Sequence, residues 1–128
     1  MTNPPKEIHY HKARKVLTVR FASSDYELPA ELLRVYSPSA EVRGHSDGER
    51  QLQTGKKYVG IRNIEAVGNY AIRIEFDDGH DSGIYAWDYL AELGRTQQSL
   101  WQAYLAELKQ ANASRLPAIP VGQWTPKS

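Results

Sequence analysis

Hydrophobic and polar residues alternate most regularly between positions 70 and 76. The apolar residues of this stretch occupy every second position: Tyr70, Ile72, Ile74 and Phe76. A period of two is expected of a β-strand with one buried and one solvated face. Gly68-Asn69 precedes the stretch and Asp78-Gly79 follows it, and such pairs supply the positive φ of two-residue hairpin loops. The pattern predicts the middle strand of a three-stranded antiparallel meander.

The flanking segments complete this meander and lead into a helix. Residues 57–67 are rich in β-branched side chains and predict the first strand, and residues 81–85 predict the third. Residues 86–93 follow with the spacing of a helix, because Trp87, Leu90 and Leu93 share one helical face. Gly94 suits the position just beyond a helix end, so we expect the helix to stop there.

The N-terminal part predicts a second set of strands and short helices. Residues 8–11 and 16–21 form a hairpin around a charged turn, and residues 25–28 form a short third strand. Pro29 then begins a short helix to residue 36, and Ser37 before Pro38 can cap a further helical turn. Residues 44–56 are polar with three glycines, which predicts an exposed, mobile loop.

The C-terminal part predicts a separate helix and a tail. Thr96 suits the N-cap of a helix that ends near Asn112. Its apolar face holds five large residues at helical spacing: Leu100, Trp101, Tyr104, Leu105 and Leu108. The last residues place prolines around Trp124, which is typical of an extended tail whose tryptophan docks on its own domain or on a neighbouring chain. The predicted fold is therefore α+β: a small antiparallel β-sheet of hairpins and a three-stranded meander, with short helices and a C-terminal helix.

Composition limits the classes of function. The 128 residues, 41% of them hydrophobic, suffice for one core and leave no room for a second catalytic domain. A net charge of +1 provides no overall field for nucleic acid or an anionic membrane. The lack of cysteine excludes disulfides, thiolate metal sites and a cysteine nucleophile. Without a long apolar run or the apolar core of a signal peptide, we expect a soluble cytoplasmic protein.

Two other features are weak indications of ligand binding, one for a metal ion and one for nucleic acid. His9 and His11 lie two apart, so on a strand they face the same way, and two imidazoles so placed can ligate one metal ion. No third ligand lies nearby in the sequence, which favours ordinary surface positions on an edge strand. Basic residues interleaved with Tyr58 and Tyr70 could form a face for single-stranded nucleic acid, but the balanced charge favours solvated strand faces. Nucleic-acid binding is therefore not expected.

Three separated segments together resemble one known family: LLRVYSPSAEV at 32–42, IEAVGNY at 64–70 and DDGHDSGIYAW at 77–87. Over about residues 6 to 95 the chain resembles the gamma-butyrobetaine hydroxylase-like N-terminal domain family, also called DUF971, in its free-standing bacterial form. The resemblance implies a small α+β domain. Relatives precede the catalytic domain of gamma-butyrobetaine and trimethyllysine dioxygenases, accompany Mrp-type P-loop ATPases of iron–sulfur cluster assembly, or occur alone. We divide the chain into residues 1–95, the family-like domain, and residues 96–128, a C-terminal helix and proline-containing tail packed on the same domain.

The resemblance also implies a lost zinc site. In the dioxygenases, this domain binds structural zinc through a Cys-x-Cys-x-x-Cys loop and one histidine. The corresponding positions here are Ser37, Ser39 and Val42 for the cysteines and His80 for the histidine. Serine and valine are not credible zinc ligands, so three of the four ligands are missing and no cofactor is expected. We expect Val42 to pack locally and His80 to form hydrogen bonds across the former site.

These observations favour a non-enzymatic interaction or accessory module. The resemblance implies a protein partner, such as an Mrp-type ATPase or another protein of iron–sulfur or cofactor assembly. The dioxygenase reaction needs two histidines and a carboxylate on a separate jelly-roll domain, so that activity is not expected. The alternatives are a metal-binding protein in which His80, with His45, holds zinc or iron, and a small enzyme of unknown reaction.

The C-terminal helix suggests where a partner would bind. Exposed aromatic patches tend to mark protein contacts. We expect a homodimer or a partner surface within residues 97–124, built from a small set of side chains: Trp101, Tyr104, Leu105, Leu108 and Trp124. Equal weight goes to the simpler interpretation, in which this helix completes the core of its own domain.

Overall fold

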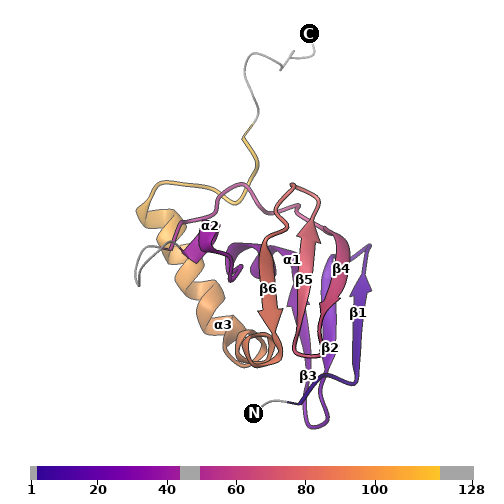
Figure 1. Cartoon of the computed structure of the whole chain (residues 1–128). Coiled ribbons are helices and arrows are strands. Elements are labelled where there is room, and N and C mark those ends of the chain that lie inside the picture. Colours follow the sequence, from indigo (N-terminus) through magenta and orange to yellow (C-terminus); the bar gives the residue numbers. More distant parts are fainter. Residues whose placement is uncertain (1–2, 44–49, 119–128) are drawn as a thin grey trace.

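The computed structural model describes residues 3–43 and 50–118, which form two three-stranded antiparallel sheets and three helices (Figure 1). The predicted α+β fold is confirmed. The first sheet contains β1 (Glu7–His11), β2 (Val16–Arg20) and β3 (Asp25–Pro29), paired in that order. The second contains β4 (Ile61–Val67), β5 (Ala71–Phe76) and β6 (Gly83–Ala86), also in sequence order.

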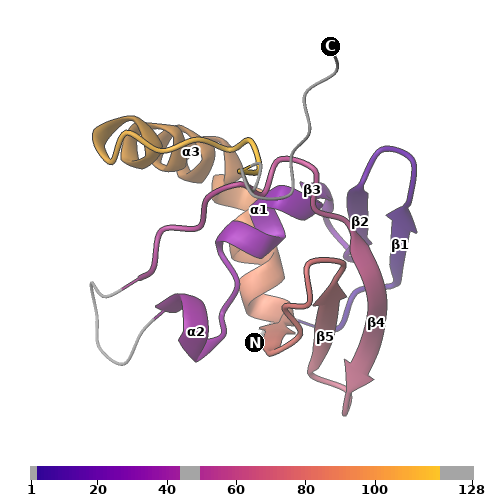
Figure 2. The same ribbon diagram turned by 90° about the horizontal axis from the view of Figure 1, so that it is seen from above.

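The helices supply much of the core. The short helices α1 (Ala30–Val35) and α2 (Ala40–Arg43) follow the first sheet, and every residue of α1 is buried. Figure 2 shows α1 between α3 (Trp87–Gln110) and the strands. The largest fully buried side chains come from both sheets and from all parts of the chain: Tyr85, Tyr104, Phe76, Leu17, Leu28, Leu32 and Leu33. No helix among the described residues is long and apolar enough to cross a membrane.

The meander is confirmed, with changes at its turns. Ile72, Ile74 and Phe76 are buried as predicted, but Tyr70 is 59% exposed and the strand begins at Ala71, which is fully buried. The prediction for Tyr70 was wrong because Val67 pairs with Ala71, so residues 68–70 all belong to the turn. Residues 77–82 link β5 to β6. Neither connection is therefore a two-residue loop.

The positive backbone angles expected at these turns are present at the two glycines. Gly68 has φ 56° and Gly79 has φ 93°. A Cβ added at Gly79 would meet no atom within 4 Å. The backbone angle alone therefore selects glycine at this position, without any steric contribution from neighbouring groups.

Replacing Gly79 by valine should consequently lower the free energy of unfolding by about 1 kcal/mol or more, because a β-branched residue resists positive φ. Gly79→Asn is the matched control and should cost less, since asparagine tolerates this region better. Urea denaturation of the three proteins measures the difference. Equal stability of the valine variant and the wild type would contradict the turn geometry.

The predicted break between two C-terminal helices was wrong, because α3 runs without interruption through Gly94. A Cβ at Gly94 would lie 2.3 Å from Cγ of Tyr26 on β3, so glycine is needed here for close packing of the helix on the sheet. Thr96 does not cap a new helix; its hydroxyl donates to the Glu92 carbonyl 2.7 Å away. The predicted division at residue 95 therefore falls within one helix, whose second half packs into the same core.

The end of α3 lies close to its predicted place. Asn112 adopts φ 54°, and its N–H donates to the Lys109 carbonyl. The N–H of Ala113 donates to the Leu108 carbonyl at 2.8 Å. These two bonds form a Schellman motif, which satisfies carbonyls that the helix leaves unpaired at its end.

The segment predicted as an exposed, mobile loop is only partly within the described structure. Residues 44–49, with His45, lie outside it. Residues 50–57 pack on the domain: Leu52 contacts the core, and the N–H of Gly55 donates to the Ser114 carbonyl at 2.9 Å. Residues 50–56 do form a loop in which no residue is fully buried, and backbone hydrogen bonds link the loop to residues after α3.

Candidate functional site

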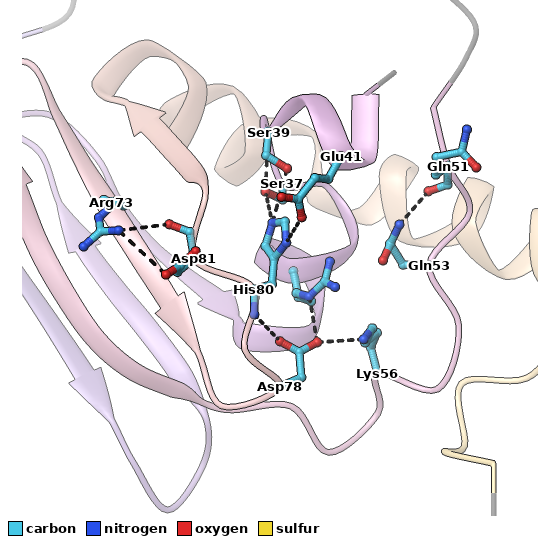
Figure 3. A network of polar contacts seen from close by, with 11 residues as sticks. Ser37, Ser39, Glu41, Gln51, Gln53, Lys56, Arg73, Asp78, His80 and Asp81 are labelled. Atoms are coloured by element: carbon cyan, nitrogen blue, oxygen red, sulfur yellow. Dashed lines mark hydrogen bonds and ion pairs between the residues drawn. The ribbon is translucent and has the colours of Figure 1, made fainter. Parts of the chain in front are cut away.

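The connection between β5 and β6 fixes the position of His80. The N–H of Phe76 donates to the His80 carbonyl at 2.9 Å, and the N–H of Gly79 donates to the Phe76 carbonyl at 3.1 Å. The N–H of His80 donates to Oδ1 of Asp78 at 3.1 Å. These bonds direct the imidazole toward the segment that joins α1 to α2 (Figure 3).

The imidazole of His80 contacts three polar side chains, two from that segment and one from α2. Its Nε2 lies 2.8 Å from Oγ of Ser37 and 3.3 Å from Oγ of Ser39. Its Nδ1 lies 3.2 Å from Oε2 of Glu41, and only 4% of the His80 side chain is exposed. The predicted hydrogen bonds of His80 are therefore confirmed, and Ser37 and Ser39 do lie around it (Figure 3).

The fourth predicted position is apolar and buried. Val42 lies on α2 and is 1% exposed, as expected for local packing in place of coordination. Among the described residues, no group of three or more histidine, cysteine, aspartate or glutamate side chains is arranged to hold a metal ion. Within this part of the chain, His80 is thus surrounded by hydroxyls and one carboxylate.

Ser37, His80 and Glu41 have the connectivity of a catalytic triad, with a hydroxyl at Nε2 and a carboxylate at Nδ1. The arrangement differs from a working site in its exposure. Ser37 is 1% exposed, and a Cβ at Gly83 would lie 2.5 Å from its Oγ, so the backbone of β6 covers the hydroxyl. Glu41, by contrast, is 70% exposed. The polar group therefore joins α2 and the segment before it to the β5–β6 connection, and the Ser37 hydroxyl is buried.

A partly buried ion pair lies next to His80 and makes a second link between these segments. Oδ2 of Asp78 accepts hydrogen bonds from Nε of Arg34 at 2.8 Å and from Nζ of Lys56 at 2.6 Å. Burial raises the pKa of Asp78, but Lys56, the His80 amide and Arg34 outweigh it and lower the pKa to about 2. Little in the sequence pattern indicates this pair, since Arg34 lies in a short amphipathic segment and Asp78 in a turn.

The charge state of His80 is set by the same surroundings. Burial lowers the pKa of the imidazole below its ordinary value, and the nearby Arg34 guanidinium lowers it further. Glu41 and Asp78 act in the opposite direction, with smaller effect. The neutral imidazole is therefore favoured in the folded protein at neutral pH.

Folding stability should fall as the pH is lowered from 7 to 5. The unfolded chain takes up a proton at His80 more readily than the folded protein, so the contribution of His80 is complete above pH 6.5 and is lost as pH falls through the lower folded pKa. His80→Gln should flatten this part of the stability profile. Urea midpoints measured across this range test the prediction, and identical slopes for wild type and His80→Gln would refute it.

A surface groove lies between α1 and the middle of α3. It has a volume of about 420 Å³ and is lined by eight residues: Pro29, Glu31, Leu32, Gln97, Gln98, Trp101, Gln102 and Arg115. The guanidinium of Arg115 lies over the Trp101 ring, 5.0 Å from its centre. Nε and Nη2 of Arg115 also donate to the two carboxylate oxygens of buried Glu31, at 2.8 and 2.7 Å. These contacts hold Trp101 in one position at the edge of the groove.

The residues predicted for a partner surface differ in burial, and some of them lie in the core. Tyr104 is fully buried, with its hydroxyl donating to the Gln53 carbonyl at 2.7 Å, and Leu108 is 5% exposed. Both belong to the core of their own chain, so their assignment to an exposed surface was wrong. Trp101 lines the groove and Leu105 is 36% exposed, while Trp124 lies outside the described residues. The stripe at helical spacing is thus divided between the core and the surface.

Comparisons with known proteins identify one family and several similar structures. The model of the family described as gamma-butyrobetaine hydroxylase-like, N-terminal, matches residues 8–91. A search of curated proteins finds no significant match. One solution NMR structure is 49% identical, covers 97% of this chain and 98% of its own, and has a TM-score of 0.81. A second is 42% identical, with 98% and 95% covered and a TM-score of 0.79.

A shorter crystal structure is also similar. It is that of a protein of unknown function from the DUF971 family of Acidithiobacillus ferrooxidans ATCC 23270, with 35% identity and a TM-score of 0.60. The likeness covers 92% of that protein but 71% of this chain. Five of the eight residues that line the groove lie after residue 91, where the family match ends.

Proposed function

Because this chain belongs to the gamma-butyrobetaine hydroxylase-like, N-terminal family, we propose that it is a non-catalytic accessory module that binds a partner protein in the cytoplasm. The observation that carries the proposal is the groove between α1 and α3, where Trp101 is held at the surface by Arg115. Tryptophan and arginine are the residue types that most often contribute large binding energies at protein interfaces.

The fixed position of Trp101 supports this role of the groove. Arg115 is tied to Glu31 by two hydrogen bonds and stacks on the indole, so little side-chain freedom remains to be lost on binding. Three glutamines of α3 supply amide donors and acceptors around the indole: Gln97, Gln98 and Gln102. Such a groove suits an extended protein segment, whose backbone groups need hydrogen-bond partners and whose apolar side chains need a pocket.

The burial of the polar group at His80 supports a role without catalysis. A nucleophile must be reached by its substrate, and the Ser37 hydroxyl is covered by the backbone of Gly83. The bonds of His80 instead connect elements far apart in sequence, from α2 to the β5–β6 connection. The role of His80 is then to hold the domain in shape, which a binding module needs as much as an enzyme does.

The class of partner is taken from the family resemblance. Some domains of this family accompany Mrp-type ATPases of iron–sulfur cluster assembly. We take a purified ATPase of this type as the first partner to test. Calorimetry should show binding to the wild-type chain and at least tenfold weaker binding to Trp101→Ala, because truncation removes the aromatic anchor of the groove. Gln98→Arg, which fills the groove from an exposed position, should weaken binding as well.

Leu105→Ala is the matched control, since Leu105 lies on the same helix, is exposed and does not line the groove. It should bind like the wild type. If the ATPase binds all four proteins equally, the groove is not the interface. If it binds none of them, the partner class is wrong, and light scattering then distinguishes a homodimer from a monomer.

A further inference from the structure

Two histidines outside the site described above lie side by side on the surface. His9 and His11 project from the same face of β1, which is an edge strand of its sheet. Their ring centres are 4.5 Å apart, and the ring planes meet at 68°. His9 is exposed and His11 is half-buried, so solvent reaches the pair.

This separation fits two imidazoles bound to one ion. A metal–nitrogen bond of about 2.0 Å places the centre of an imidazole ring about 3.2 Å from the metal. Two rings bound at right angles around one ion then have centres about 4.5 Å apart, the arrangement found in tetragonal coordination. The rings of His9 and His11 have this spacing.

A neighbouring hydroxyl orients one of the two rings. Nε2 of His11 lies 3.0 Å from Oγ1 of Thr18 on β2, and Thr18 stands opposite His9 in the strand register. A neutral imidazole that donates its Nε2–H to this hydroxyl has its lone pair on Nδ1. Histidines that bind metals are commonly oriented by such a hydrogen bond from the other ring nitrogen.

We propose that His9 and His11 together bind one Cu²⁺ ion, with Thr18 as a positioning residue. Cu²⁺ accepts a tetragonal arrangement of nitrogen ligands and binds such donors more tightly than the other divalent ions of its row. A structural zinc site needs four protein ligands, and no cluster of three or more candidate ligands occurs in residues 3–43 and 50–118. Water completes the coordination, so the site is open at the surface.

The test is a Cu²⁺ titration of the full chain without an affinity tag. One equivalent should bind, and the paramagnetic ion should first broaden the NMR signals of His9, His11 and Thr18. His9→Ala and His11→Ala should each lower the affinity at least tenfold, because either change leaves a single imidazole. His45→Ala is the control and should retain the wild-type affinity.

Two results would reject the pair of ligands. Loss of affinity in only one of the two variants would show binding by a single histidine, and loss in His45→Ala would place the ion elsewhere. Thr18→Val should weaken binding severalfold without changing the stoichiometry, because the His11 ring is no longer oriented. Unchanged affinity in Thr18→Val would remove the positioning role from the proposal.

Discussion

Replacing Gly94 by alanine should lower the free energy of unfolding by about 2 to 3 kcal/mol, although alanine is the better helix former. An added Cβ would lie between 2.3 and 2.7 Å from three atoms of the Tyr26 ring. One of these is Cγ, which lies on the axis of ring rotation, so turning the ring about the Cβ–Cγ bond does not relieve the clash. The helix or β3 must shift, and the cost of that shift exceeds the gain in helix propensity of about 1 kcal/mol.

The sign of the effect should reverse when Tyr26 is removed. In a Tyr26→Ala background, Gly94→Ala meets no ring, and only the helix propensity remains, so the second change should stabilise the protein by up to about 1 kcal/mol. Urea denaturation of the four proteins of this cycle gives both values. Destabilisation by Gly94→Ala in both backgrounds would show that the contact with Tyr26 is not the reason for glycine.

Gly94 shows why the sequence pattern did not predict the length of α3. A glycine after Leu93 is consistent with a helix end and with close packing inside a longer helix, because both need a residue without a Cβ. The contact that decides between them comes from Tyr26 on β3, far away in sequence. The strands of the meander were predictable because their alternation is local. The length of α3 was not, since it depends on a tertiary contact.

In the candidate sites, too, some residues could be identified from the sequence and others are placed only by the fold. The resemblance identified His80, Ser37 and Ser39, and the structure brings these three side chains together. Glu41 was not identified as their neighbour, since its place depends on the fold of α2. On α3, the apolar stripe predicted one continuous face, but residues 50–57 cover part of it and leave Trp101 at the groove. A single helical period gives no information about which segment covers which part of a face.

Changing Ser37, Ser39 and Val42 together to cysteine should produce a zinc site with His80. The two serine oxygens already lie 2.8 and 3.3 Å from Nε2 of His80. Tetrahedral zinc separates its nitrogen and sulfur ligands by about 3.5 Å, so small rotamer changes at residues 37 and 39 suffice to bring the cysteine sulfurs to this distance from Nε2. The N–H of Val42 donates to the Ser39 carbonyl at 3.1 Å, so residue 42 lies within one turn of residue 39.

Glu41 strengthens this prediction, because its carboxylate lies 3.2 Å from Nδ1 of His80 and can orient the ring for coordination through Nε2. The triple variant should bind one zinc ion and gain about 3 kcal/mol in free energy of unfolding when free zinc exceeds its Kd a hundredfold. Adding His80→Ala should remove one ligand and most of that gain, and the wild type should gain nothing. Elemental analysis and urea denaturation measure both quantities. A folded triple variant that takes up no zinc would show that the three positions do not converge on His80, even though two of their oxygens now contact it.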